Sequence, residues 1–278
     1  MSSRIERPVP TQTGWDIELA DVDEYLARIE HPRLPPTAAA LHSLHEAHIR
    51  AIPFENVDVL LGTHRGLGLQ AVTDKLVRRQ RGGYCFEHGL LFAAVAEQLG
   101  YQVSRLICRV QPHRAGPRTH MSLKVRAEEQ DYLVDVGFGN GLFTSVPLRD
   151  GIVSDQGGWK YTLTRQDRTW TLAQQTADGW EPRHSFDECD EQRPIDYEVS
   201  HHYVSTHPGS PFTHQLIVMR LEPGLSRRLI GNTLNVEHAD GRLEQTPVPL
   251  EQLEDTLRSL DVVLDRGEMA ERRARIGR

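Results

Sequence analysis

The spacing of the apolar residues changes near residue 100 of this 278-residue chain, so no single class of secondary structure fits the whole sequence. Before that point, apolar residues recur at helical spacing over 22–29 and 41–49. Over about 102–180 they alternate with polar residues, which is typical of half-buried strands. The last third mixes the two patterns, with helical spacing over 194–203 and 250–260. The sequence therefore predicts helices first, then an antiparallel β region, then a mixed α/β region.

The composition narrows the classes of protein that fit. A hydrophobic content of 38% is adequate for a folded chain of this length. No apolar run approaches the ~20 residues needed to span a bilayer, and the first residues lack the apolar stretch of a secretory signal. A net charge of −7 argues against nonspecific binding to nucleic acid or anionic membranes, although a local basic site could hold an anionic cofactor. Three scattered cysteines without a C-x-x-C pair favour a reducing cytoplasm over a disulfide framework.

A cysteine follows a sharp turn at the start of a predicted helix. Gly82 and Gly83 let the backbone bend just before Cys85, and the helical pattern runs from there to Gly100. Free amide N–H groups and the positive end of the helix dipole lower a thiol pKa at this position, so Cys85 is a candidate nucleophile. The alternative is a buried structural thiol, which the polar residues beside Cys85 argue against.

A candidate base and an orienting group lie downstream, on two strand-like runs joined by a polar turn. A two-residue turn at 127–128 would place His120 directly opposite Asp135. A four-residue loop over 127–130 would make the two residues diagonal neighbours. In both registers the side chains share a face, at about 5 to 8 Å between backbone positions. An odd-length loop without a bulge would put them on opposite faces.

Asp135 interrupts an apolar strand, where an unpaired carboxylate would be costly to bury. A hydrogen bond to one ring nitrogen of His120 would satisfy the carboxylate and fix the tautomer. The alternatives are an Asp135 that faces solvent on an edge strand and a His120 that is one of 14 ordinary histidines. Because a cysteine nucleophile needs a base and a group to orient it, the pattern favours a Cys85-His120-Asp135 triad.

Two further patterns invite binding hypotheses. His42, His45 and His48 are spaced i, i+3, i+6 and not i, i+4 as in a helical zinc site, so we expect a solvated or partly packed helix face and no metal. The segment Gly137–Gly141 lacks the G-x-G-x-x-G pattern of a dinucleotide site. Its backbone N–H groups could hold phosphate oxygens, and a simple glycine-rich turn is the alternative.

Four separated blocks of the sequence resemble the signature of the arylamine N-acetyltransferase family, bacterial type. The blocks are 52–56, 81–87, His120 and 134–139. The segment 205–212 resembles a further block, and the likeness extends from about Asp21 to the C-terminal helix. The chain departs from a typical bacterial member by about twenty residues before the first helix.

This resemblance implies an α+β fold with a cysteine-protease-like Cys-His-Asp triad. It divides the chain into an N-terminal helical bundle with the nucleophile, an antiparallel β-barrel-like domain with His120 and Asp135, and an α/β lid; the expected bounds are 1–100, 101–192 and 193–278. The positions that match the family's acceptor pocket, where an aromatic amine can stack, are Tyr84, Phe138 and Phe212. Ordinary core packing is the alternative. The positions expected to contact the pyrophosphate of coenzyme A are Gly139, Asn140 and Gly141. We also expect Arg81 and Glu55 to form a charge pair that steadies the cysteine turn.

The implied activity is acetyl-CoA-dependent N-acetylation of arylamines and arylhydrazines, and O-acetylation of N-arylhydroxylamines, through an acetyl-cysteine intermediate. Acetyl-CoA would be the co-substrate, no metal is needed, and the resemblance allows a homodimer. One alternative is an amide synthase or a transferase that uses a longer acyl-CoA or a polyketide thioester. A cysteine hydrolase is another. A non-catalytic xenobiotic-binding protein is a third, and the intact Cys, His and Asp argue against it.

Overall fold

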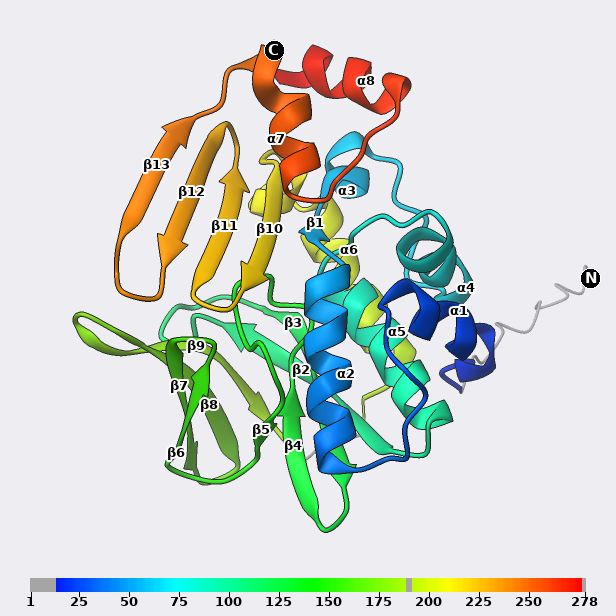
Figure 1. Ribbon diagram of the computed structural model, residues 1–278, viewed down its shortest axis with the longest axis vertical. Coiled ribbons are helices and arrows are strands. Elements are labelled where there is room, and N and C mark those ends of the chain that lie inside the picture. The colour runs from blue at the N-terminus through cyan, green and yellow to red at the C-terminus, as the bar shows by residue number, and fades with distance from the viewer. Residues whose placement is uncertain (1–13, 189–191, 277–278) are drawn as a thin grey trace, which may run out of the picture.

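The computed structural model describes residues 14–188 and 192–276, and helices and antiparallel sheets follow one another in the expected order (Figure 1). The α-helices are α1 (Val22–Arg28), α2 (Ala38–Ala51), α3 (Val57–Leu61), α4 (Leu69–Thr73), α5 (Cys85–Gln98), α6 (Pro194–Thr206), α7 (Leu253–Ser259) and α8 (Arg266–Ile276). The strands are β1 (Phe54–Glu55), β2 (Gln102–Val110), β3 (Arg118–Ala127), β4 (Gln130–Val134), β5 (Val146–Pro147), β6 (Ile152–Gln156), β7 (Trp159–Gln166), β8 (Thr169–Thr176), β9 (Gly179–Asp187), β10 (Ile217–Glu222), β11 (Leu225–Ile230), β12 (Thr233–His238) and β13 (Leu243–Pro247).

The N-terminal helices begin where side-chain caps are available. The Asp21 carboxylate accepts the Glu24 N–H at the start of α1, and the Thr37 hydroxyl accepts the Ala40 N–H at the start of α2. Each side chain satisfies an N–H that has no partner within its helix, which is why the two helices begin at these residues. Helix α2 ends at Ala51, just ahead of Pro53, because the residue before a proline disfavours helical backbone.

The expectation of a solvated or partly packed histidine face on α2 is wrong for two of its three histidines. His45 and His48 are completely buried. The two ring nitrogens of His48 lie 2.8 Å from the Tyr25 hydroxyl and 2.7 Å from Nδ1 of His88, so this face joins α2 to α1 and α5. Helix α2 therefore packs inward, with the polar atoms of His48 paired to its neighbours, which the helical spacing alone did not indicate.

An eight-stranded antiparallel sheet, in the order β5-β4-β3-β2-β9-β8-β7-β6, forms a nearly closed barrel beside the helices (Figure 1). Strands β3 and β4 pair in the register Leu123↔Val134 and Arg126↔Asp131. Glu128 takes a φ of 56° in the tight turn between them. This is the even register in which His120 and Asp135 are diagonal neighbours on one face.

A second sheet, in the order β1-β10-β11-β12-β13, belongs to the C-terminal part but takes its edge strand β1 from the N-terminal part. Helices α3, α7 and α8 share a second hydrophobic core with this sheet. The predicted helix over 250–260 is a 3₁₀ turn at Leu250–Gln252 followed by α7, and α8 was not predicted. Since β1 and α3 pack with the C-terminal elements, the division at 100 and 192 stays a prediction.

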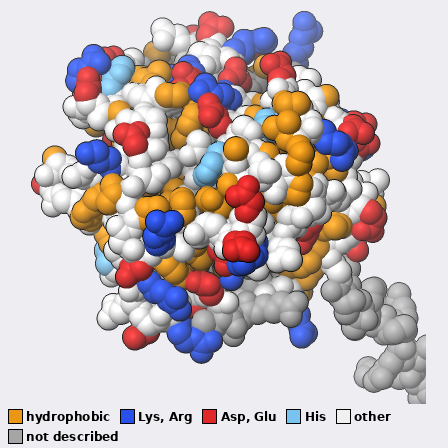
Figure 2. All heavy atoms as spheres, turned by 60° about the horizontal axis from the view of Figure 1, so that its bottom comes forward, with side chains coloured by type: hydrophobic (Ala, Val, Ile, Leu, Met, Phe, Trp, Pro, Cys, Tyr) orange, Lys and Arg blue, Asp and Glu red, His pale blue; other side chains and the backbone are white. Residues whose placement is uncertain are grey.

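Charge is mixed on the surface face drawn in Figure 2, where acidic and basic side chains are interspersed with apolar ones. Within the described parts of the chain, no helix is both long and apolar enough to cross a bilayer.

Candidate active site

Cys85 is the first residue of α5, and its thiol points toward the strand that carries His120. The Glu87 carboxylate accepts the Tyr84 N–H at 3.1 Å, which fixes the start of the helix. The Sγ atom of Cys85 lies 3.6 Å from the carbonyl oxygen of Thr119 on β3. Cys85 is only 5% exposed, so the candidate nucleophile is held inside the protein.

His120 and Asp135 form a buried pair beside it. Nε2 of His120 lies 2.9 Å from Oδ2 and 3.1 Å from Oδ1 of Asp135, and the two residues are 2% and 1% exposed. An ionised carboxylate only accepts hydrogen bonds, so Nε2 carries the proton in this pair. Nδ1 is then the ring nitrogen that can take a proton from a thiol.

Asp135 has a second histidine partner, which the sequence analysis missed. Nε2 of His184, on β9, donates to Oδ2 of Asp135 at 2.9 Å, and His184 is completely buried. A signal was present in the sequence: the turn-like residues 177–179 precede a run in which His184 and Phe186 alternate with polar residues. That pattern is typical of a strand, and assigning it would have placed His184 on an inward face.

The electrostatics of the site are set by burial and by these pairs. Burial raises the pKa of Asp135, but the His120 and His184 contacts outweigh it and hold that pKa well below its ordinary value. Burial also raises the pKa of the Cys85 thiol, and the backbone N–H groups of Met121 and Phe86 only partly oppose it. The expected lowering by the helix terminus is therefore outweighed, and a thiolate here needs a proton acceptor beside it.

A network of buried charges supports the turn that holds Cys85. The expected pair is present, with Nη2 of Arg81 at 3.3 Å from Oε1 of Glu55. Nη1 of Arg81 also lies 2.6 Å from Oε1 of Glu268 on α8, so the C-terminal helix is tied to the same turn. Lys75 contributes a second buried ion pair, 3.0 Å from the Glu87 carboxylate that caps α5.

The glycine-rich segment after Asp135 lies against α5 and the second sheet. A Cβ atom at Gly137 would lie 2.7 Å from Cα of Cys85, so only glycine allows this close approach. At Gly139 and Gly141 a Cβ would contact side chains of Met219 and Phe138 below 3.0 Å. Of the three residues expected to contact coenzyme A, Asn140 is the one that lines a surface cleft.

The aromatic residues expected in an acceptor pocket lie in two places. The Phe138 ring is half-buried and meets the His120 ring edge-on, with centroids 5.0 Å apart. Tyr84 is completely buried, and its hydroxyl pairs with His201 on α6. Phe212 packs on Tyr84 at 5.8 Å between centroids. The structure thus brings Phe138 to the triad and joins Tyr84 with Phe212.

The cleft that contains Asn140 lies between the β8–β9 hairpin and the end of β12 with the turn that follows it, and has a volume of about 560 Å³. Arg183 and Arg228 also line it. The Arg183 guanidinium sits 5.5 Å from the centre of the Phe138 ring. The cleft is therefore joined to the candidate triad through one aromatic side chain.

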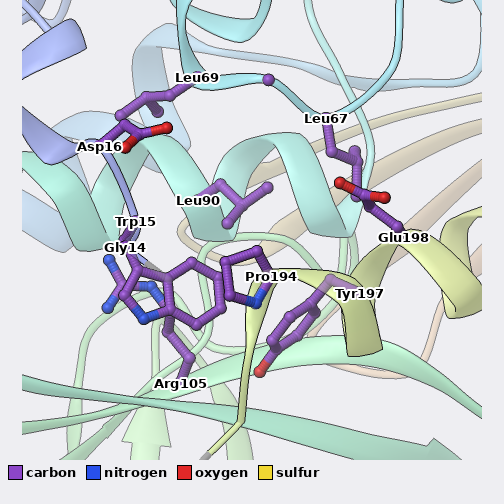
Figure 3. Close-up of a pocket in the computed structure, with 11 residues that line it drawn as sticks. Gly14, Trp15, Asp16, Leu67, Leu69, Leu90, Arg105, Pro194, Tyr197 and Glu198 are labelled. Carbon is purple, nitrogen blue, oxygen red and sulfur yellow. The ribbon is translucent and has the colours of Figure 1, made fainter. Parts of the chain in front are cut away.

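A separate small pocket lies beside the N-terminal segment, where Trp15, Leu90 and Tyr197 come together from three parts of the chain (Figure 3). The Arg105 guanidinium stacks 4.1 Å from the centre of the Trp15 ring. The residues that line this pocket include none of the candidate triad. The contacts of Trp15 with Arg105 on β2 and Tyr197 on α6 hold the segment before α1 against the rest of the protein.

Among the described residues, one group of donors is close enough to hold a metal ion: His120, Asp135 and His184, whose donor atoms lie within 4.8 Å of one another. Those atoms already hydrogen-bond to one another at 2.9 Å. A bound ion would have to replace both hydrogen bonds.

A cysteine at a helix N-terminus, beside a histidine that a carboxylate orients, is the arrangement of enzymes that use a cysteine nucleophile.

Comparison with known proteins narrows the class of enzyme. A family model described as N-acetyltransferase matches residues 37–268. The arylamine N-acetyltransferase of Mycolicibacterium smegmatis is 40% identical over 257 residues, which cover 88% of this chain and 90% of the relative. The arylamine N-acetyltransferase / N-hydroxyarylamine O-acetyltransferase of Salmonella typhimurium is 34% identical, over 81% of this chain and 82% of the relative.

A solved structure agrees with these sequence matches. The arylamine N-acetyltransferase of Mycobacterium marinum, in complex with CoA, superposes with a TM-score of 0.84 at 33% identity. The match covers 92% of this chain and 98% of the M. marinum chain. The protein therefore belongs to the arylamine N-acetyltransferase family, and the α+β fold expected from the sequence is confirmed.

Proposed function

We propose that this protein transfers the acetyl group of acetyl-CoA to arylamines, arylhydrazines and N-arylhydroxylamines, with Cys85 as nucleophile, His120 as base and Asp135 as the orienting residue. The observation that carries the proposal is the meeting of three elements in one buried site. Helix α5 supplies the thiol, β3 supplies the imidazole, and the segment after β4 supplies the carboxylate 2.9 Å from that imidazole. The family membership of the chain supports the substrate class.

In the first half-reaction the Cys85 thiol gives its proton to Nδ1 of His120, and the thiolate attacks the thioester carbonyl of acetyl-CoA. The N–H of Phe86 at the start of α5 is suited to stabilise the oxyanion that forms. Collapse of the tetrahedral intermediate breaks the bond from carbon to the CoA sulfur. The CoA thiolate leaves with the proton from His120, and Cys85 carries the acetyl group.

In the second half-reaction the amine attacks the acetyl carbon of the thioester on Cys85. His120 accepts the proton that the amine loses, and the bond to the Cys85 sulfur breaks. The products are the amide and the imidazolium–thiolate pair, which is the state that attacks the next acetyl-CoA. Asp135 keeps Nε2 of His120 protonated in both halves. Because CoA leaves before the amine attacks the acetyl group on Cys85, we expect ping-pong kinetics.

The surroundings of the triad suggest where the substrates lie. We assign Asn140, which lines the cleft, to the phosphates of CoA. The cleft also holds Arg183 and Arg228, which pair with Glu181 and Glu237, so either guanidinium would have to leave its carboxylate to bind a phosphate. Phe138 separates this cleft from His120, and we assign its ring to the acceptor pocket together with Phe212 and Tyr84. Tyr84, which is completely buried, would serve as the back wall.

Both described cysteines, Cys85 and Cys108, are free thiols. A catalytic thiolate must stay reduced, so we infer a cytoplasmic location. A homodimer remains a prediction, which light scattering on the purified protein would test.

Intact mass spectrometry after a brief incubation with acetyl-CoA tests the mechanism. We expect one added acetyl group, absent from Cys85→Ala and removed when an arylamine is added. An unmodified protein without CoA release would refute acetyl transfer and point to a longer acyl or polyketide thioester donor. Release of CoA and acetate from an unmodified protein would instead indicate a cysteine hydrolase.

A further inference from the structure

Two histidines approach the Asp135 carboxylate from strands on either side of β2. On one side β2 pairs with β3, where Cys108 lies opposite His120. On the other side β2 pairs with β9, where Val110 lies opposite His184. Both Nε2 atoms end 2.9 Å from the same oxygen, Oδ2 of Asp135, and the two rings lie 5.0 Å apart between centroids. The Gly137 N–H adds a longer bond of 3.4 Å to Oδ1.

A histidine is a costly choice at position 184 unless its Nε2 is needed. The residue is completely buried, and among the described residues its Nδ1 has no hydrogen-bond partner. An apolar side chain in the same core would avoid burying that nitrogen. The feature that an apolar residue could not supply is the N–H that Asp135 accepts.

We propose that His184 is a positioning residue for the transfer reaction: its Nε2–H holds the Asp135 carboxylate in the orientation in which Asp135 fixes the ring of His120. This inference rests on the proposed function. Without His184, the donors left to the carboxylate among the described residues would be His120 and the distant Gly137 N–H. The carboxylate and the imidazole could then turn together, and Nδ1 of His120 would not be held in the orientation that proton transfer from the Cys85 thiol needs.

The charge balance of the cluster agrees with this role. The Asp135 ion pairs found among the described residues are those with the two histidines. Burial lowers the pKa of His184, but the Asp135 hydrogen bond and the neighbouring Cys108 thiol together outweigh it and the pKa is raised. The other titratable groups that face the cluster are His45 on α2, Cys85 on α5, Cys108 on β2 and Tyr161 on β7. Burial lowers the pKa of His45 to about 4, so His45 stays neutral near pH 7 and does not replace His184.

Three variants separate positioning from simple packing. His184→Leu removes the donor, and His184→Gln keeps an amide N–H near the place of Nε2. Phe186→Leu is the matched packing control: Phe186 is buried two residues further along the same strand and its ring lies 6.2 Å from that of His184, so the change disturbs the packing around His184 without removing the donor. Two rate constants are measured for each: acetylation of Cys85 by acetyl-CoA, and alkylation of Cys85 by iodoacetamide as a function of pH. Thermal unfolding of each variant reports its stability.

We expect His184→Leu to slow acetylation on the order of 10-fold or more and to move the pH midpoint of alkylation. His184→Gln should recover most of the rate and the wild-type midpoint, and Phe186→Leu should change neither. Equal losses in His184→Leu and His184→Gln, or a wild-type midpoint in His184→Leu, would overturn the proposal. If His184→Leu does not fold, His184→Asn is measured in its place, because the shorter side chain of asparagine does not bring its amide to Asp135. Rates in His184→Asn equal to those in His184→Gln would then overturn the proposal.

The two readouts also distinguish this inference from the proposed function. Alkylation needs no acyl donor, so it reports the Cys85 thiolate even if acetyl-CoA is not a substrate. A wild-type protein that is not acetylated, but whose alkylation depends on His184, would refute the proposed function and keep the positioning role. If the wild-type protein is acetylated, and His184→Leu is acetylated at the same rate, the proposed function stands and the positioning role of His184 is refuted.

Discussion

The backbone of Gly137 packs directly on that of Cys85, so closely that a Cβ atom at position 137 would lie 2.7 Å from Cα of Cys85 and 2.8 Å from its carbonyl oxygen. Gly137 is two residues after Asp135, and its N–H bonds to the Asp135 carboxylate. This contact presses the segment after β4 against the start of α5. The distance between the candidate nucleophile and its orienting residue is therefore set by backbone packing.

Gly137→Ala should separate these two elements. The added methyl group meets backbone atoms that cannot move independently, so we expect a loss of about 1–3 kcal/mol in the free energy of unfolding. The acetylation rate of Cys85 should fall more steeply than the stability does, because the triad is displaced. Gly116→Ala is the control, since a Cβ there meets nothing within 4 Å. Equal activity of the two variants would show that the close approach does not matter.

Asp135→Asn keeps the shape of the side chain and removes its charge. The amide group no longer accepts from both histidines, so His120 loses the partner that fixes its tautomer and stabilises the imidazolium. We expect the transfer rate to fall on the order of 10³-fold or more, with similar losses in His120→Ala if the residues act as a unit. Steady-state turnover with an arylamine and acetyl-CoA measures this. Near-normal turnover of Asp135→Asn would show the triad assignment to be wrong.

Lys75→Met should destabilise the fold strongly. Nζ of Lys75 lies 3.0 Å from Glu87 and 3.2 Å from Asp58, and all three side chains are buried. Removing the cation leaves two buried carboxylates without the positive charge of Lys75, so the free energy of unfolding should fall by about 3–5 kcal/mol. Urea unfolding measures the loss, and the double variant with Glu87→Gln should recover part of it. A change below about 1 kcal/mol would mean that water or another group compensates.

Acid should weaken the fold through His45 before the carboxylates titrate. Burial lowers the pKa of this histidine from 6.5 to about 4, so the folded state favours the neutral ring. Its contribution is present above pH 6.5 and is lost as the pH falls toward 4. Between pH 7 and pH 5 this amounts to about 2 kcal/mol, which His45→Leu should remove from the pH dependence of unfolding. An unchanged pH slope in His45→Leu would contradict this assignment.

The parts of the site that could be predicted from the sequence depend on local rules. The glycine turn and the helical pattern after it place Cys85 at the start of α5. The even register of the β3–β4 hairpin puts His120 and Asp135 on one face, because side chains alternate along a strand. The caps of α1 and α2 depend on residues next to the helix starts, and the pair of Arg81 with Glu55 depends on their opposite charges.

Only the tertiary structure decided the features that depend on burial and on distant pairing. His184 reaches Asp135, 49 residues away, because β9 pairs with β2, and no local pattern predicts that pairing. Glu268 reaches Arg81 across 187 residues because α8 shares a hydrophobic core with α3, and the sequence does not show that contact either. The Cys85 pKa also depends on the fold: its position on the helix can be predicted from the sequence, but the exclusion of water from the thiol reverses the expected direction of the shift. Periodicity shows which residues share a face, whereas the neighbours of that face are determined when the whole chain packs.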